Sequence, residues 1–377
     1  FQWRGIPQPG QLLPMGLQHV VAAVVGVITP AILVADTCGL SSADKTLMIQ
    51  VSLILTALAT LLQLFPIFHR IGSGLPVIMG ISFAYIPTLQ AIGGELGLPT
   101  ILGAEIVAIV FGVLVKWIRP LFPPLVTGTV IFTIGLSLYP TAVKYMAGGA
   151  GSEWFGSAKS WAVALITLAV VVFLNHFTKG ITKLASILIG ILAGYVIAYF
   201  LGIVDLSGVG SAAWVALPRP MPFDIQFVPA ACVSLGIVYV VNAVQTIGDL
   251  SSTTMGGMDR MPTDKELSGG IVGQGVMSIL GAFFGGLPAA TYSQNVGIVT
   301  VNRVINRAVF ALAALILLVA GLVPKFASLL TTIPQCVIGG ATISVFATIT
   351  MTGIRMITEG GFTPRKSSVV GLSVALG

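Results

Sequence analysis

Charged residues are scarce in this chain. Asp, Glu, Lys and Arg make up 8% of its 377 residues, whereas a soluble domain carries roughly 25%. Apolar residues make up 56%, and the mean hydropathy is +1.02. This shortage of charge excludes an ordinary soluble domain, and the apolar runs reach the length of about 20 residues that a membrane-spanning helix needs. The composition therefore predicts an all-α polytopic membrane protein.

Cysteine and catalytic groupings are scarce as well. The three cysteines, Cys38, Cys232 and Cys336, are far apart and odd in number, which favours small apolar fillers over a disulfide framework. No spacing suits a set of metal ligands, no nucleophile is paired with a base, and no glycine-rich loop opens a helix after a strand. We therefore expect no enzyme activity, no metal and no cofactor.

The positive charges are scattered between the apolar runs. A net charge of +6 without a basic patch gives no reason to expect nucleic acid as a partner. Thirteen of the 18 Lys and Arg residues lie in loops on the side of the N-terminus, and five lie on the opposite side. Because Lys and Arg concentrate in cytoplasmic loops, this asymmetry predicts that the N-terminus is cytoplasmic. We expect the protein to be integral to the cell (inner) membrane.

The apolar pattern predicts twelve spans and the start of another. Their expected ranges are 11–35, 46–65, 73–93, 99–115, 120–141, 160–175, 184–204, 229–250, 269–285, 287–301, 308–324 and 334–354, then 367 onward.

Two short motifs occur twice at nearly the same separation. Gly74-Leu75-Pro76 recurs at 286–288, and the Pro-x-x-Val-x-Gly of 123–128 recurs at 334–339. The repeated positions are seven spans apart, and an odd number inverts the second copy, so we expect an inverted repeat. A complete second copy would need a fourteenth span. The chain lacks an initiator Met and stops inside an apolar run, so we expect it to be clipped at both ends.

Glycine and proline interrupt the spans 73–93 and 287–301. Broken helices are tolerated at membrane depth only where they face protein or a wet cavity, and paired breaks in two halves indicate a transporter's binding site. The alternative is that these glycines only allow close helix packing. A neighbouring proline and a polar run favour the binding site.

The interrupted spans carry the polar side chains that could hold a ligand. Aligning the two Gly-Leu-Pro triplets places Ser82 and Phe83 opposite Gln294 and Asn295, and we expect these four residues to come together. A side-chain amide offers both a donor and an acceptor, and an aromatic ring stacks on a flat solute. This combination predicts a small planar ligand with alternating donors and acceptors.

Further polar residues lie in other spans. Gln245 and Asp249 share one helix face, and an ionisable group within a span is a functional candidate, although Asp249 could also be a solvated cap. Gln274 could contact the site or form a helix–helix hydrogen bond. His19 is expected beside the site. Glu105 could reach the membrane interface, and a part in coupling is its alternative role.

These residues resemble the nucleobase–ascorbate transporter family, also called nucleobase–cation symporter-2. Its signature, Gln/Glu-Asn-x-Gly, reads Gln294-Asn295-Val296-Gly297 here. Its Gln-His pair in the first span is matched by Gln18-His19, and its Glu-x-x-Gly-Asp reads Gln245-Thr246-Ile247-Gly248-Asp249. The resemblance extends from about residue 10 to the end.

The resemblance implies a fold of fourteen spans in two inverted sets of seven. Residues 10–117 and 229–330 would form a core domain, and 118–228 and 331–377 a gate domain. The core would move against the gate in an elevator-like cycle. Membrane lipid would surround the protein, and two copies would pair through their gate domains as a homodimer.

The resemblance also implies a substrate. Gln294 matches the purine-type members, where uracil-type members have Glu, and Ser293 is the small residue before it. Phe83 corresponds to the aromatic residue of the first break, and Ser82 stands where xanthine carriers often have Asn. We therefore expect substrate contacts from Gln245, Gln294, Ser293, Phe83 and Ser82.

Two carboxylates of the family are amides here, Gln245 and Gln274. An amide cannot titrate, so Asp249, with His19 second, becomes the candidate for proton coupling. The sequence thus predicts a proton-coupled permease (another cation is the alternative) that imports xanthine or urate. A uracil permease and an uncoupled purine uniporter are the alternatives.

Overall fold

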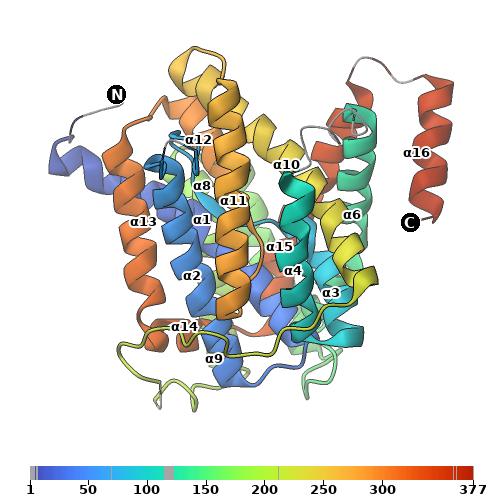
Figure 1. The fold of residues 1–377 in the computed structure, drawn as a ribbon. Helices are drawn as coiled ribbons and strands as arrows, with labels where there is room; N and C mark the ends of the chain where they lie inside the picture. Colours follow the sequence, from blue (N-terminus) through green and yellow to red (C-terminus); the bar gives the residue numbers. More distant parts are fainter. Residues whose placement is uncertain are drawn as a thin grey trace. The chain divides into compact units, whose positions relative to one another are not determined.

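The computed structural model describes residues 5, 7–68, 70–113, 123–210, 212–359, 361 and 363–376, and this part of the chain is predominantly helical (Figure 1). The expected domain boundary near residue 117 lies outside the described residues. So do Arg4, Lys116 and Arg119, three of the basic residues that predict the orientation.

The chain divides into two units, which are described separately. The first comprises Phe1–Lys116 and Ser207–Thr331, and the second Trp117–Leu206 and Thr332–Gly377. The segment 207–228, expected at the end of the gate domain, groups with the first unit, because its backbone is bonded there. Met221 N donates to Phe283 O at 2.7 Å, and Gln226 N donates to Pro99 O at 3.0 Å. The roles of core and gate stay predictions.

The first unit holds most of the helices and both strands. Its elements in chain order are α1 (Pro9–Thr37), α2 (Ser42–Leu64), β1 (Met79–Ile81), η1 (Phe83–Tyr85), α3 (Ile86–Leu96), α4 (Leu98–Val113), α10 (Pro229–Met258), α11 (Asp264–Phe284), β2 (Ala289–Thr291), α12 (Ser293–Asn302), α13 (Arg307–Gly321) and α14 (Pro324–Thr331). Helices α1, α2 and α13 pack on one another, and α4 packs on α10 and α11 (Figure 1).

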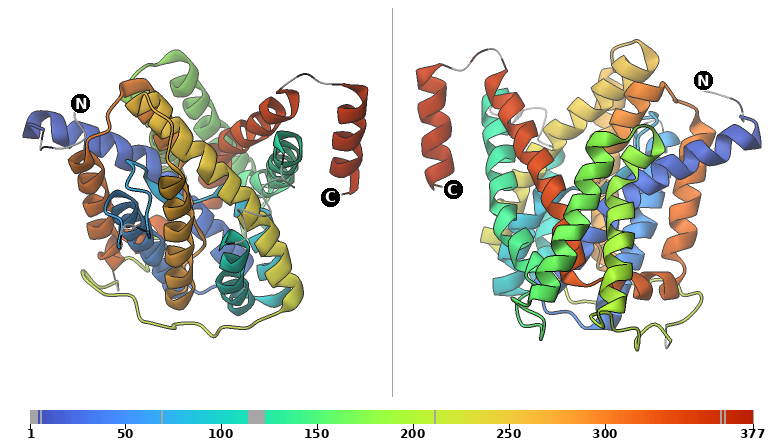
Figure 2. Two further views of the ribbon diagram at one scale, coloured as in Figure 1. Left: turned by 45° about the horizontal axis from the view of Figure 1, so that its top comes forward. Right: turned by 180° about the vertical axis from the view of Figure 1, so that it is seen from behind.

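The second unit is built around two long helices. Its elements are α6 (Pro124–Met146), α7 (Ala158–Phe177), α8 (Ile181–Leu184), α9 (Ser186–Phe200), α15 (Gln335–Thr358) and α16 (Pro364–Leu376). Figure 2 shows α6 and α15 side by side. Glycines allow this approach: a Cβ on Gly353 would lie 2.5 Å from Phe132 N, and one on Gly128 would lie 2.8 Å from Met356 Cβ.

Local signals explain where the helices near the candidate site begin and end. Thr263 and Glu266 form a capping box at the start of α11, with Thr263 N donating to Glu266 Oε2 at 2.8 Å. Gly285 ends the same helix in the left-handed region at φ +78°, a conformation that glycine adopts without steric cost. Pro229 opens α10 at a position where its missing N–H removes no helical bond.

The expectation of a polytopic helical membrane protein is confirmed. Within the described residues, seven helices are long and apolar enough to cross a membrane, and α13 with α14, bent by 79°, would make an eighth span. Helices α4 and α9 are apolar but shorter. The ranges 73–93 and 287–301 each contain a short strand followed by helix. The count of fourteen spans and the inverted repeat stay predictions.

A close contact fixes the second strand against α1. A Cβ on Gly26 of α1 would overlap the ring of Tyr292, the residue that joins β2 to α12. Tyr292 is itself 7% exposed and packs with Ala23, Ile78 and Phe310. Gly26 therefore gives the Tyr292 ring the space it occupies.

Replacing Gly26 with alanine should destabilise the protein, since overpacking a filled interior costs about 1–3 kcal/mol. We expect the midpoint of thermal unfolding in detergent to fall by several degrees. Gly10→Ala is the matched control on the same helix, because nothing lies within 4 Å of a Cβ built there. Equal melting of the two variants would contradict the contact.

Candidate substrate site

A two-stranded ladder forms the centre of the candidate site. Strands β1 and β2 pair antiparallel, with Met79 opposite Thr291 and Ile81 opposite Ala289. Every residue of both strands is buried. The pairing continues to Tyr292, whose N donates to Ile78 O at 3.0 Å. The strands thus pair with each other on one side, and on their outer sides Met79 N donates to Thr60 Oγ1 and Ala289 N to Ser278 Oγ, both at 3.0 Å, as an apolar interior requires.

The Gly-Leu-Pro triplet precedes each strand and explains why the chain is extended there. Leu75 and Leu287 are 0% and 2% exposed, so each anchors its segment in the interior. The proline that follows each leucine has no N–H and disfavours a helical residue before it. Gly74, at φ +72°, adopts a conformation that other residues rarely reach.

The register sends the two polar ends of the ladder in opposite directions. Ser82 follows β1 beyond the pair Ile81–Ala289, whereas Ser293 follows β2 beyond the pair Met79–Thr291. Both serines then start helical segments, and Ser82 Oγ accepts a hydrogen bond from Ala84 N at 3.2 Å. The register thus places Ser82 and Phe83 after one end of the ladder and Gln294 and Asn295 after the other, and their convergence on one ligand stays a prediction.

Asp249 of α10 is the charged centre on the β2 side. Thr291 Oγ1 donates to its Oδ2 at 2.6 Å, and Ser293 Oγ donates to the same oxygen at 2.9 Å. The residue is 8% exposed, and no Lys or Arg forms an ion pair with it in the described part of the chain. Two hydroxyl donors thus hold a buried carboxyl group. The position is unlike the solvated cap that the sequence left open.

Gln245 and Ser293 form the exposed edge in front of this carboxyl group. Gln245 lies one turn before Asp249 on α10, and its Nε2 donates to Ser293 Oγ at 3.0 Å. Gln294 follows Ser293 in the first turn of α12 and is exposed. The structure therefore brings together three predicted residues, Gln245, Ser293 and Asp249, and Gln294 is the next residue after Ser293 in the chain.

Gln274 belongs to the buried packing of α10 against α11. Its Oε1 accepts from Thr246 Oγ1 at 2.7 Å, and its Nε2 donates to Asn242 Oδ1 at 2.8 Å. It is 0% exposed, as its alternative role as a helix–helix hydrogen-bonding residue requires. Thr246 also lies 3.3 Å from Thr291 Oγ1, which connects this network to Asp249.

His19 and Asn295 join α1 to α12 behind the exposed edge. Asn295 Nδ2 is 3.0 Å from His19 Nδ1 and donates to His19 O at 3.1 Å. The imidazole is 1% exposed and its ring centroid lies 4.4 Å from that of Phe310. Both side chains therefore position α12, and neither faces the open edge.

Comparison with known proteins identifies the family. A sequence profile described as a permease family matches residues 10–377. The xanthine permease of Bacillus subtilis is 36% identical over 380 residues, which cover 98% of this chain and 85% of that protein. The uric acid transporter UacT of Escherichia coli is 32% identical, over 99% of this chain and 78% of that protein. The chain belongs to the nucleobase–ascorbate transporter family.

Solved structures support the fold of this family member. The transmembrane domain of the cyanobacterial bicarbonate transporter BicA superposes with a TM-score of 0.68 at 18% identity, covering 97% of this chain and 95% of that one. Murine Slc26a9, an anion transporter in the inward-facing state, gives 0.64 at 12% identity, covering 98% and 69%. The family and its relatives are transporters, so the expectation that the chain is not an enzyme is confirmed.

Sequence reasoning did not single out Thr246 and Thr291, which complete the network around Asp249. Thr246 lies inside the motif of residues 245–249, and Thr291 ends β2, two residues before Ser293. Their roles depend on contacts between helices and strands distant in sequence. A metal site is not formed: within the described residues, no three His, Cys, Asp or Glu side chains cluster to hold one.

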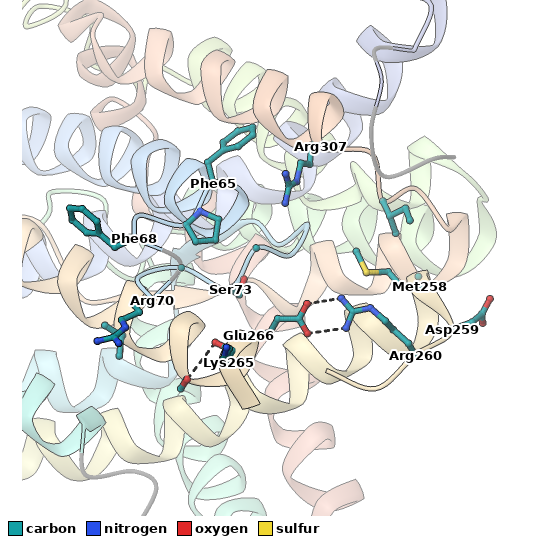
Figure 3. A pocket seen from close by; sticks show the side chains of 17 residues that line it. Phe65, Phe68, Arg70, Ser73, Met258, Asp259, Arg260, Lys265, Glu266 and Arg307 are labelled. Carbon is teal, nitrogen blue, oxygen red and sulfur yellow. Dashed lines mark hydrogen bonds and ion pairs between the residues drawn. The ribbon is translucent and has the colours of Figure 1, made fainter. Parts of the chain in front are cut away.

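A separate cavity of about 1460 Å³ lies beside residues 72–74, which precede β1 in the chain (Figure 3). It is lined by Ser73, Arg70 and Lys265, and by the ion pair of Arg260 with Glu266, whose two contacts are 2.9 and 2.6 Å. None of the predicted substrate residues lines it.

Removing the hydroxyl of Thr291 should weaken the fold, because a hydrogen bond to a charged group contributes about 1.5–3 kcal/mol. We expect Thr291→Val to lower the thermal unfolding midpoint in detergent by several degrees. Thr300→Val is the control, since Thr300 Oγ1 donates only to Val296 O within α12.

A double-mutant cycle separates the contact with Asp249 from other effects. In an Asp249→Asn background the cost of Thr291→Val should shrink to less than half. An undiminished cost would mean that Thr291 stabilises the ladder without the carboxyl group.

Proposed function

We propose that this chain imports oxidised purine nucleobases, xanthine or urate, across the cell membrane as a proton-coupled secondary transporter. The observation that carries the proposal is the open edge formed by Gln245, Ser293 and Gln294 in front of the buried Asp249. Amide and hydroxyl groups there can both donate and accept hydrogen bonds. The names of the relatives, a xanthine permease and a uric acid transporter among them, support the same substrate class.

The substrate would contact the helical segments that begin at the two ends of the ladder. Ser82 and Phe83 begin a helical segment at one end, and Ser293 and Gln294 begin another at the opposite end. The positive ends of two helix dipoles favour an acceptor-rich or anionic solute. Phe83 offers the aromatic surface on which a flat ring would stack.

Amides at positions 245 and 294 favour the binding of urate more than carboxylates at these positions would. Urate is an anion at neutral pH, and two like charges 4 Å apart repel by about 4 kcal/mol at an effective dielectric constant near 20. A glutamine can grip the ring edge without this cost. Gln245 and Gln294 would then hold opposite edges of the purine.

The proposed transport cycle is the one that the family resemblance implies. We propose fourteen spans in two inverted sets of seven, with the first unit as the core that moves in an elevator-like cycle and the second as the gate. The full protein would pair as a homodimer through the gate, with its N-terminus in the cytoplasm. The similarity of fold to anion transporters supports the architecture.

Coupling to protons would use Asp249. Its carboxyl group is buried beside the substrate edge and is reached through Ser293, so its protonation and substrate binding would influence each other. An uncoupled purine uniporter is the second candidate, because the neighbouring Gln245 and Gln274 cannot titrate.

Uptake of radiolabelled xanthine, urate and uracil by the full-length protein in proteoliposomes tests the substrate. We expect Gln294→Glu to weaken the apparent affinity for urate at least tenfold, about 1.4 kcal/mol, and that for xanthine less. Gln90→Glu on α3 is the control, since Gln90 donates to Thr37 away from this edge. Unchanged urate affinity, or a wild-type preference for uracil, would refute the assignment.

The same vesicles test the coupling residue. Asp249→Asn should retain exchange of labelled for unlabelled purine but lose acceleration by an inward proton gradient. Asp259→Asn, at an exposed carboxyl group paired with Arg303 at 3.2 Å, should behave like the wild type. A wild type indifferent to the gradient would favour the uniporter.

A further inference from the structure

A second buried carboxyl group lies in the first unit, apart from the substrate edge. Glu105 of α4 is 0% exposed, and neither of its carboxyl oxygens has a hydrogen-bond partner among the described residues. No Lys or Arg forms an ion pair with it in that part of the chain. The sequence left open that its side chain reaches the membrane interface, but the structure places it in the interior.

The groups around Glu105 are hydroxyls and small residues. Tyr85 of η1 and Tyr239 of α10 lie close enough to interact electrostatically with the carboxyl group, and their ring centroids are 6.3 Å apart. Both hydroxyls are buried without a hydrogen bond of good geometry. On α11, a Cβ on Gly281 would lie 3.4 Å from Glu105 Oε1, and one on Gly275 would lie 3.1 Å from Tyr239 Oη.

These neighbours include no positive charge. The helices packed on α4 are α3, α10 and α11, and the titratable groups they and η1 direct at Glu105 are Tyr85 and Tyr239. The nearest acid on α10 is Asp249, ten residues beyond Tyr239 and thus about 15 Å along the helix. Ionisation of a carboxyl group is strongly disfavoured in such surroundings, so in this conformation we expect Glu105 to be a neutral carboxylic acid.

Tyr85 links this acid to the substrate segment. It lies two residues after Phe83 in the same 3₁₀ turn, and its hydroxyl also interacts with the Gln274 side chain, which bonds to Thr246 in the network of Asp249. A shift of the β1–η1 segment on substrate binding would therefore move a hydroxyl relative to the Glu105 carboxyl group. This changes the energy difference between its neutral and ionised forms.

We propose that Glu105 is a proton-binding residue of the transport cycle, held neutral among Tyr85, Tyr239 and α11 and linked to the substrate segment through Tyr85. One proton binds a carboxylate oxygen of Glu105 to form the acid, and the same proton leaves to water when the cluster is hydrated. The inference rests on the proposed proton-coupled transport and adds a second carboxyl group to it.

The test begins with infrared spectra of the full-length protein, which need no transport. The carbonyl band of a protonated carboxylic acid should be present at neutral pH and should diminish in Glu105→Gln. Glu95→Gln, at an exposed glutamate of α3, should leave it unchanged. A wild type and Glu105→Gln with the same band would overturn the proposal, whatever the substrate proves to be.

Transport then separates a proton carrier from a neutral packing group. Glu105→Gln keeps the shape of the neutral acid, so exchange of labelled xanthine or urate should remain within about twofold of the wild type. Accumulation driven by an inward proton gradient should fall at least tenfold, and its pH profile should flatten. Glu105→Asp, which retains a titratable group, should restore part of the gradient response.

Each remaining outcome decides the matter. If Glu105→Gln accumulates purine with the wild-type pH profile, Glu105 is only a buried structural acid and the proposal is wrong. If the wild type exchanges purine but ignores the gradient, the proposal fails while the substrate assignment stands. If the wild type exchanges no nucleobase at all, the proposed function fails and the role of Glu105 in that cycle fails with it, although its infrared band still reports its protonation.

Discussion

The pairing of β1 with β2 is the interaction on which the candidate site depends. Two strands of three residues lie in an apolar interior, where an unpaired backbone N–H or C=O costs several kcal/mol. The strands pair with each other, Thr60 and Ser278 accept from the outward N–H groups of Met79 and Ala289, and the register that results directs Ser82 and Ser293 out of opposite ends. The polar side chains proposed to face a substrate are thus placed by backbone hydrogen bonds, with Leu75 and Leu287 anchoring the segments.

The ladder also separates the groups that meet solvent from those that carry charge. Gln245 is half-buried and Gln294 is exposed at the proposed substrate edge, where an amide can exchange water for a ligand. The carboxyl group of Asp249 lies behind them with Thr291 and Ser293 as donors. Ser293 Oγ accepts a hydrogen bond from Gln245 and donates one to Asp249. A ligand at the proposed edge and a proton on the carboxyl group would therefore both act on this hydroxyl.

Much of this arrangement could be predicted from local sequence. The repeated Gly-Leu-Pro triplet marked both extended segments, and the spacing of Gln245 and Asp249 placed them on one helix face. The pairing register could not be predicted, because the triplets align as repeats whereas the strands pair antiparallel. For the same reason the contacts of Gln274 with Asn242, and of segment 207–228 with the first unit, lay beyond the sequence: they join residues from different elements.

The two buried carboxyl groups are distributed between the two extended segments. Asp249 is held by hydroxyls of β2 and α12, whereas Glu105 lies against Tyr85, which follows β1. Had both acids been placed on one side, each charge would have opposed ionisation of the other. Tyr239, the residue of α10 beside Glu105, lies about 15 Å along that helix from Asp249, and this spacing weakens that opposition. In the proposed cycle each acid responds to its own segment, so a substrate that contacts both ends of the ladder would influence two protonation sites at once.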